Sequence, residues 1–194
     1  MSGILLVTGK TGAGKTTLIS SLLADNHNFV DFALADKLKE LTFKLLKLFK
    51  VDIKELDDLY DDNKYDYREY LQQIGTECCR NVFGDNFWCK LLDEDIEKAL
   101  KDGKNVIISD IRYPNEINYF KNKYSNYQVF TVKVVRKDSE TNDHSSEKEV
   151  DNIDANITIK NDLTDSFYDK IEVVNFLFKH YQLLDIKPKL IVFH

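Results

Sequence analysis

Residues 9–16, GKTGAGKT, have the G-x-x-x-x-G-K-T spacing of a loop that binds phosphate groups. The apolar run Ile4–Val7 before them predicts a strand, and the residues from Lys15 to Ala24 predict a helix. Glycines let backbone N–H groups approach phosphate oxygens, and the helix N-terminus directs partial positive charge at the same anion. An ordinary glycine-rich turn is the alternative, but it requires the strand and the Lys-Thr pair to coincide by accident.

The last two residues of the motif indicate the kind of ligand. Lys15 is expected to span the β and γ phosphates, and the Thr16 hydroxyl to take one position on Mg²⁺. The loop therefore predicts a site for a nucleoside triphosphate with its magnesium ion.

A second strand is predicted over Lys104–Ser109 and is followed by a carboxylate, Asp110. In phosphate-loop enzymes the end of such an apolar strand is the expected place for a second residue that holds Mg²⁺ or water. Arg112 should point from the same strand end toward the nucleotide, and Pro114 should open the next helix.

A helix predicted from Tyr67 onward has a polar face without the Lys and Glu repeats of an ordinary solvated surface. This face suits a monophosphate and a base edge, because guanidinium groups bind phosphate with two hydrogen bonds and an amide both donates and accepts. The alternative is a helix surface with ion pairs to nearby glutamates. The polar face consists of Arg68, Gln72, Thr76 and Arg80, and the core-facing stripe of Leu71, Ile74, Cys78 and Val82.

Two further candidates lie before and after this helix. Asp36 is expected to cap a helix and to place Lys39 in its first turn, after the extended segment 28–35, where open α/β sheets bind ligands. A plain cap with a solvated lysine is the alternative. Trp88 could stack on a base, although such a tryptophan more often packs in a core. The packed face of the capped helix should carry Leu38, Leu41, Leu45 and Leu48.

The remaining segments complete an α/β pattern. Residues 51–66 are interpreted as an acidic connector with a short helix, and strands are predicted over 128–136 and 155–160. The polar segment between these strands is typical of a mobile flap over phosphates, and a disordered solvated loop is the alternative. A final helix is expected over 164–181, and the apolar tail 187–194 receives no role. The core side of that helix should carry Phe167, Ile171, Val174 and Leu177.

Composition limits the other possibilities. A chain of 194 residues is expected to form a single domain, and its net charge of −6 argues against a nucleic-acid surface while permitting a small basic pocket. No apolar run is long enough to cross a membrane and no signal peptide is evident, so a cytoplasmic protein is expected. The three cysteines are predicted to be reduced thiols in the core rather than disulfide partners or zinc ligands.

The chain resembles the deoxynucleoside monophosphate kinases of bacteriophages and large DNA viruses, a branch of the phosphate-loop kinases. Only the phosphate loop is specific by itself, whereas the ordered set of motifs is much harder to obtain by chance. The matching residues are 9–16, 35–39, Arg68 with 71–72, 75–77 and Arg80, Trp88, 110–112, 115–116 and 144–147.

The resemblance implies a three-layer α/β phosphate-loop kinase fold whose mainly parallel sheet is flanked by helices. It implies one domain over 1–194, with a helical monophosphate-binding insertion at about 36–92 and a short lid at about 137–150. The implied reaction is Mg²⁺-dependent transfer of the γ-phosphoryl group of ATP to a deoxynucleoside 5′-monophosphate, for DNA synthesis in the cytoplasm, that of the host if the protein is viral. Related enzymes often pair, so a homodimer is a further expectation.

The resemblance also implies residue roles. The residues expected to hold ATP are Gly12, Ala13, Gly14, Lys15, Thr16 and Thr17, with Thr16 and Asp110 on Mg²⁺. Those expected to hold the acceptor are Asp36, Lys39, Arg68, Gln72, Thr76, Arg80 and Trp88. The catalytic group would be Lys15, Asp110, Arg112 and Arg136. The lid offers lysines where many nucleoside monophosphate kinases have arginines, so arginines outside it would supply the charge, or the lid would mainly exclude water.

Three other functions compete with this interpretation. A kinase of another small phosphorylated metabolite, such as phosphomevalonate or dephospho-coenzyme A, would share the loop, the lid and the arginines. A nucleotide-gated binding module is a rival from another class, although the sequence lacks a guanine-reading motif and a switch glycine in the expected places. A purely structural domain is disfavoured by the joint presence of Lys15, Thr16 and Asp110.

Overall fold

The computed structural model describes residues 2–25, 28–60, 66–137, 149–164, 166–180 and 191–193. The chain divides into two compact units, the first comprising Met1–Phe32 with Glu94–His194 and the second Ala33–Asp93. The bounds of the second unit are close to those predicted for the helical insertion. In the described part of the chain, no helix has the length and apolar character needed to cross a membrane.

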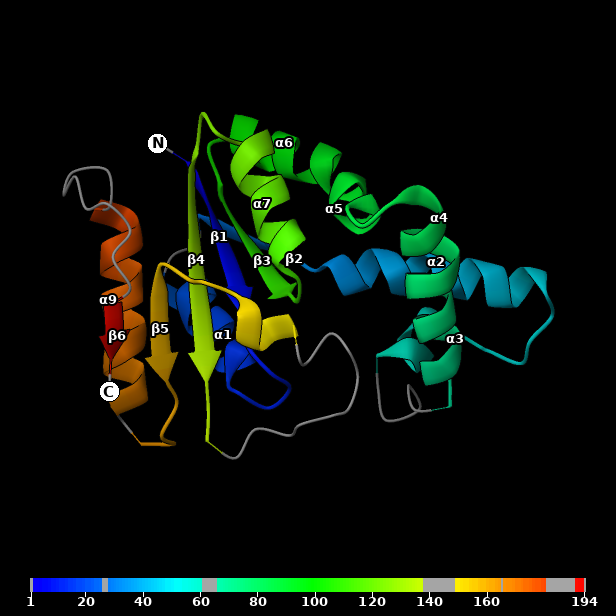
Figure 1. Ribbon diagram of the computed structural model, residues 1–194, viewed down its shortest axis with the longest axis horizontal. Helices are drawn as coiled ribbons and strands as arrows, with labels where there is room; N and C mark the ends of the chain where they lie inside the picture. Colours follow the sequence, from blue (N-terminus) through cyan, green and yellow to red (C-terminus); the bar gives the residue numbers. More distant parts are fainter. Residues whose placement is uncertain are drawn as a thin grey trace. The chain divides into compact units, whose positions relative to one another are not determined.

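The first unit contains a six-stranded sheet with the order β2-β3-β1-β4-β5-β6, and every pairing in it is parallel (Figure 1). All strands therefore end at the same edge, and β1, which leads into the phosphate loop, lies between β3 and β4. The predicted parallel α/β fold is confirmed. The strands are β1 Gly3–Thr8, β2 Phe29–Phe32, β3 Asn105–Ile111, β4 Gln128–Val135, β5 Ile157–Lys160 and β6 Ile191–Phe193.

Helices cover both faces of this sheet and produce the predicted three layers (Figure 1). Side chains of β1 alternate between the faces, so Leu5 and Val7 join the core under α1 and α9, whereas Ile4 and Leu6 are buried on the face of α6 and α7. The helices are α1 Lys15–Asp25, α6 Asp93–Lys101, α7 Pro114–Lys123 and α9 Ser166–His180.

Several element ends differ from the prediction. Strand β3 continues through Asp110 to Ile111, because Ile111 pairs with Thr8 and accepts a 2.8 Å hydrogen bond from the Thr8 hydroxyl. Strand β4 stops at Val135 and leaves Arg136 beyond its end. Helix α7 begins at Pro114, as predicted.

The C-terminal region contains the predicted helix and, after it, a strand that was not predicted. Helix α9 buries Phe167, Ile171 and Val174 in the core shared with α1, and Leu177 packs against this core. The tail to which no role was assigned supplies β6, which extends the sheet beside β5.

The second unit is helical and has its own small core. That core is the cluster of Leu46, Ile53 and Leu59, with partly buried apolar side chains around it. Its elements are α2 Leu34–Leu48, the 3-10 helix η1 Leu56–Leu59, α3 Arg68–Gln72, the π-helix η3 Gln73–Arg80, α4 Asn81–Phe83 and α5 Phe87–Leu91.

Helix α2 begins earlier than expected, so the prediction that Asp36 caps it is wrong. Its N-cap is Ala33, and Asp36 lies within the first turn. The packed face also differs, because Leu34, Thr42 and Leu46 are buried whereas Leu48 is 72% exposed. The leucine pattern was misleading here because the buried face includes a threonine, Thr42, and a leucine before the expected start of the helix, Leu34.

Residues 68–83 form a continuous helical path whose central part is a π-helix, and this changes which side chains are buried. Ile74 and Cys79 are buried, but Cys78 and Val82 of the predicted core stripe are exposed. The stripe was drawn for the α-helical period, and the i→i+5 bonding of a π-helix shifts every later side chain around the axis. Cys79 and Cys89 are buried thiols as expected, and Cys78 is the exception.

Candidate active site

The phosphate loop requires glycine where it passes its neighbours most closely. Gly9 and Gly14 have φ angles of 149° and 107°, in the region that residues with a side chain rarely adopt. A Cβ atom at Gly9 would collide with the carbonyl oxygen of Val134, and one at Gly14 would collide with the side-chain amide of Asn161. The loop is thus shaped by the ends of the strands beside it as well as by its own sequence.

Lys15 reaches back across the loop. Its Nζ donates hydrogen bonds to the carbonyl oxygens of Gly9 at 2.7 Å and Lys10 at 2.9 Å. Thr16 and Thr17 lie exposed in the first turn of α1. The ammonium group and the two hydroxyl side chains predicted to meet a triphosphate are therefore all in the loop region or the first helical turn.

Arg136 lies on the phosphate loop. It follows the last residue of β4, the strand beside β1, and its Nη1 donates a 3.1 Å hydrogen bond to the carbonyl oxygen of Gly12. The Arg136 guanidinium therefore contacts the loop directly, although Arg136 and Gly12 are 124 positions apart in the sequence.

Asp110 and Arg112 lie at the same edge of the sheet, at the end of β3 on the other side of β1. Both are half-buried. The turn is held by Glu116, a side chain only 1% exposed, which accepts hydrogen bonds from the N–H groups of Arg112 at 2.8 Å and Tyr113 at 3.1 Å. The parallel sheet thus brings the predicted catalytic residues of the first unit to one edge.

Two contacts on the loop were not predicted. The side-chain amide of Asn161, directly after β5, donates a 2.9 Å hydrogen bond to the carbonyl oxygen of Ala13. Lys10 forms a 2.8 Å ion pair with Asp151, just beyond the segment assigned to the lid. The rule that identified Asp110, a polar residue after a strand, also applies to Asn161 and could have found it.

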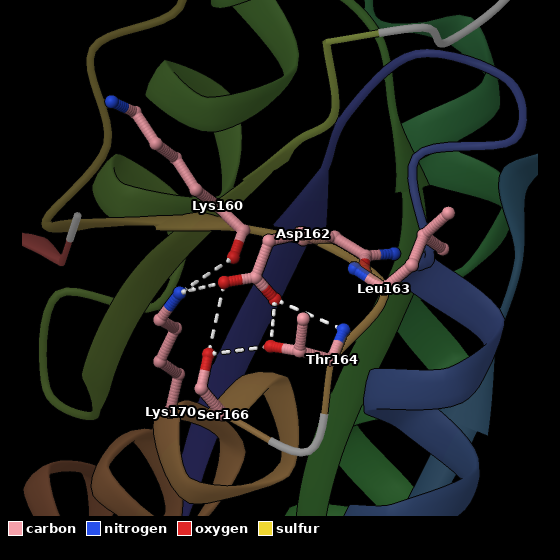
Figure 2. Close-up of polar contacts among 7 residues, drawn as sticks. Lys160, Asp162, Leu163, Thr164, Ser166 and Lys170 are labelled. Atoms are coloured by element: carbon pink, nitrogen blue, oxygen red, sulfur yellow. Dashed lines mark hydrogen bonds and ion pairs between the residues drawn. The ribbon is translucent and has the colours of Figure 1, made fainter.

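The turn between β5 and α9 is organised by Asp162 (Figure 2). Its carboxylate accepts hydrogen bonds from Thr164, Ser166 and Lys170, at 2.7 Å and 2.9 Å from the two hydroxyl groups and 3.2 Å from the ammonium. These donors, the Thr164 hydroxyl first, hold the pKa of Asp162 well below its usual value. Asp162 therefore links Thr164, Ser166 and Lys170 directly after the position of Asn161.

In the second unit, Asp36 and Lys39 are joined by Tyr60, which the sequence did not single out. The Lys39 Nζ lies 3.5 Å from the centroid of the Tyr60 ring and 3.9 Å from Asp36 Oδ1. Burial, followed by a hydrogen bond to Asp36, raises the pKa of Tyr60 to about 12. The phenol is thus protonated at neutral pH and donates to the carboxylate. Asp36 and Lys39 therefore form a group of three with Tyr60.

The four residues of the predicted polar helix face differ in their exposure to solvent. Arg68 is exposed, whereas Gln72, Thr76 and Arg80 are half-buried. The Arg80 Nη1 donates a 3.1 Å hydrogen bond to the carbonyl oxygen of Asp85, which ties this guanidinium to its own unit.

Trp88 is buried in the second unit. It is 3% exposed, and its indole N–H donates a 3.1 Å hydrogen bond to the carbonyl oxygen of Gly75. Phe87 packs against it edge to face, with the ring centroids 4.9 Å apart. The core interpretation is confirmed, and the assignment of Trp88 as a substrate-stacking residue is not supported.

Comparison with known protein families decides the class of enzyme. A family model for deoxynucleotide monophosphate kinases matches residues 44–171, about two thirds of the chain. The chain belongs to this family. The protein is therefore a kinase that acts on deoxynucleotide monophosphates. The matched region begins after the phosphate loop, so the loop motif is a separate line of support for a kinase.

Two solved structures match most of the length of this chain. A provisionally assigned kinase from Chloroflexus aurantiacus has a TM-score of 0.51 and 14% identity, covering 94% of this chain and 97% of its own. A protein from Thermus thermophilus has a TM-score of 0.43 and 13% identity, covering 92% of this chain and 97% of its own. The first likeness supports the fold alone. No curated protein matches the chain.

The structure leaves two parts of the predicted site as predictions. Of the lid assigned to 137–150, residues 138–148 lie outside the described residues. The roles assigned to individual side chains for ATP, Mg²⁺ and the acceptor also stay predictions, although the loop, Asp110, Arg112 and Arg136 share one edge of the sheet.

Proposed function

We propose that the kinase uses ATP and Mg²⁺ to convert deoxynucleoside 5′-monophosphates to diphosphates for DNA synthesis. The observation that carries this proposal is the contact of Arg136 with Gly12 of a complete phosphate loop, in a chain of the deoxynucleotide monophosphate kinase family. A triphosphate donor is supported by the loop, and a monophosphate acceptor by the family.

The first unit would hold the donor. Backbone N–H groups of residues 12–17 and the ammonium of Lys15 would bind the phosphates. The Thr16 hydroxyl and the Asp110 carboxylate are oxygen donors of the kind that Mg²⁺ prefers, and this ion keeps several waters and takes phosphate oxygens as its other ligands. The chemistry of these residues therefore fits the ion.

The second unit would hold the acceptor. The ammonium of Lys39, oriented by Asp36 and Tyr60, and the guanidinium of Arg68 are cations suited to a monophosphate. Gln72 and Thr76 offer amide and hydroxyl groups for the base or the sugar. Arg80 would combine a substrate contact with its hydrogen bond to Asp85.

The chemistry that these residues must support is chiefly electrostatic. The transition state of phosphoryl transfer spreads negative charge over three equatorial oxygens, and catalysis depends on positioning and cations. Lys15, Arg112 and Arg136 would provide fixed positive charge, and Mg²⁺ would neutralise charge on the phosphates when bound. A general base is not required, because the acceptor phosphate is already an anion near neutral pH.

The experiment that tests this proposal is a coupled assay of purified protein with ATP and Mg²⁺. Each of the four deoxynucleoside monophosphates and their ribose counterparts is offered as acceptor, and phosphomevalonate and dephospho-coenzyme A serve as comparison acceptors. We expect diphosphate formation from at least one deoxynucleotide and loss of activity with excess chelator. Turnover with only a comparison acceptor, or ATP hydrolysis without any acceptor phosphorylation, would overturn the proposal.

A further inference from the structure

Asn161 is a buried side chain placed between the phosphate loop and the turn after β5. It is 9% exposed. Its Nδ2 donates to the carbonyl oxygen of Ala13 at 2.9 Å, and its Oδ1 accepts from the N–H of Leu163 at 3.0 Å. Its own N–H donates to the carbonyl oxygen of Val135 at 2.8 Å. Hydrogen bonds at both Nδ2 and Oδ1 therefore fix the orientation of the side-chain amide.

We infer that Asn161 is a positioning residue for triphosphate binding, which acts by fixing the peptide group between Ala13 and Gly14. In a planar trans peptide the C=O and N–H bonds point in opposite directions. A hydrogen bond that holds the Ala13 carbonyl toward Asn161 therefore turns the Gly14 N–H away from it. Backbone N–H groups of such loops are the donors that phosphate oxygens use.

The close fit of Asn161 against Gly14 supports this role. A Cβ atom at Gly14 would collide with the Asn161 amide, so the pair fits only while residue 14 is glycine. The neighbouring carbonyl, that of Gly12, is held by Arg136 from the end of β4. Two carbonyls of the loop are thus held by side chains from adjacent strand ends. Arg136 is charged and half-buried, whereas Asn161 is neutral and buried and acts through the loop.

The chain provides a matched control in Asn156. This side chain is 8% exposed, and its Oδ1 accepts a 2.8 Å hydrogen bond from the N–H of Thr131 in β4. It precedes β5, whereas Asn161 follows it, so it lies at the opposite end of the strand from the phosphate loop. Replacing either asparagine removes a buried hydrogen bond to backbone, but only Asn161 touches the loop.

The test compares Asn161→Ala with Asn156→Ala by calorimetric titration of the whole chain with ATP and with inorganic tripolyphosphate, each with Mg²⁺. For Asn161→Ala we expect both affinities to fall by about tenfold or more, because the free loop is no longer held in its binding conformation and binding must then order it. Affinity for a deoxynucleoside monophosphate should be unchanged. Asn156→Ala should bind both probes like the wild type, even where its unfolding temperature is lower.

The outcomes separate this inference from the proposed function on which it rests. If the wild type binds neither ATP nor tripolyphosphate, the proposed function fails and the inference fails with it. If the wild type binds both and Asn161→Ala binds them equally well, only the inference is overturned. Equal losses in Asn161→Ala and Asn156→Ala would likewise overturn it, because they would indicate a general effect of stability.

A second variant is used if Asn161→Ala does not fold. Asn161→Asp has nearly the same volume and keeps an oxygen to accept from Leu163, but it replaces the amide donor to Ala13 with a second acceptor. We expect it to weaken tripolyphosphate binding at least as much as the alanine variant. Wild-type affinity in Asn161→Asp would show that the donated hydrogen bond is not needed and would overturn the inference.

Discussion

The ammonium group of Lys39 lies over the aromatic face of Tyr60, 3.5 Å from the ring centroid, while the Tyr60 phenol hydrogen-bonds to Asp36. Such a cation–π contact contributes about 0.5–1 kcal/mol at a partly exposed site. It also restricts a long side chain that would otherwise sample many rotamers. Tyr60 therefore orients the lysine that we propose as an acceptor ligand.

Replacing Tyr60 should affect the acceptor and not the donor. We expect Tyr60→Leu, which removes both the ring and the phenol, to raise KM for the monophosphate by roughly three- to tenfold. Tyr60→Phe keeps the ring and should raise it less. Steady-state kinetics with each substrate varied in turn measures the difference. Tyr127→Leu is the control, because Tyr127 has a similar exposure, 37% against 38%, and lies in the first unit. An equal rise in KM for ATP would contradict the assignment.

The two lysines of the phosphate loop should behave differently. Lys15→Ala should reduce kcat by at least about a hundredfold, because it removes a cation from the transferring phosphates. Lys10→Ala removes the ion pair with Asp151, whose carboxylate is 62% exposed, and should change stability by at most about 1 kcal/mol. Turnover assays and thermal unfolding of both variants test this. Near wild-type turnover in Lys15→Ala would refute the donor site.

The two arginines of the helical path should separate substrate binding from stability. Arg68→Ala and Arg80→Ala are both expected to raise KM for the monophosphate more than KM for ATP. Only Arg80→Ala should also lower the unfolding temperature, because it loses the hydrogen bond to the carbonyl of Asp85. Lys90→Ala, an exposed cation on α5, serves as the control. Equal changes in both KM values would remove these arginines from the acceptor site.

Features with a local signal were predictable from the sequence. The strand before the phosphate loop, the loop itself and helix α1 were placed within one or two residues, because an apolar run, a glycine-rich motif and a lysine follow one another directly. The parallel order of the strands then explains why Asp110 and Arg136 lie at the same edge of the sheet as the loop. The residues next to them in the sequence do not indicate this position.

Features that depend on distant partners were missed. Asn161 and Asp151 contact loop residues 148 and 141 positions away. The sequence marks Asn161 as a polar residue after a strand, but it does not show that either residue reaches the loop. Nothing in the sequence distinguishes Tyr60, because the acidic residues around it are typical of a solvated connector. The π-helix was missed because a pattern of apolar residues does not report which carbonyl each N–H contacts.

The hydrogen bonds to Asp162 make a prediction about stability and pH (Figure 2). The pKa of Asp162 is lowered in the folded protein by Thr164 and Ser166, so the folded state binds its proton less tightly than the unfolded state. The resulting stabilisation is complete above the ordinary pKa of 3.8 and is lost as pH falls through the lower folded value. Asp162→Asn should therefore lower the unfolding temperature at neutral pH, and the difference from the wild type should shrink below about pH 4.

Thermal unfolding across this pH range, followed by circular dichroism, measures that difference. Glu172→Gln is the matched control, because it neutralises an exposed carboxylate of α9 beyond its first turn. Its effect on the unfolding temperature should be small at every pH. The buried Lys170 ammonium loses its carboxylate partner in Asp162→Asn, so the destabilisation at neutral pH should exceed that of the control. A difference that stayed constant from neutral to acidic pH would show that ionisation of Asp162 does not stabilise the turn.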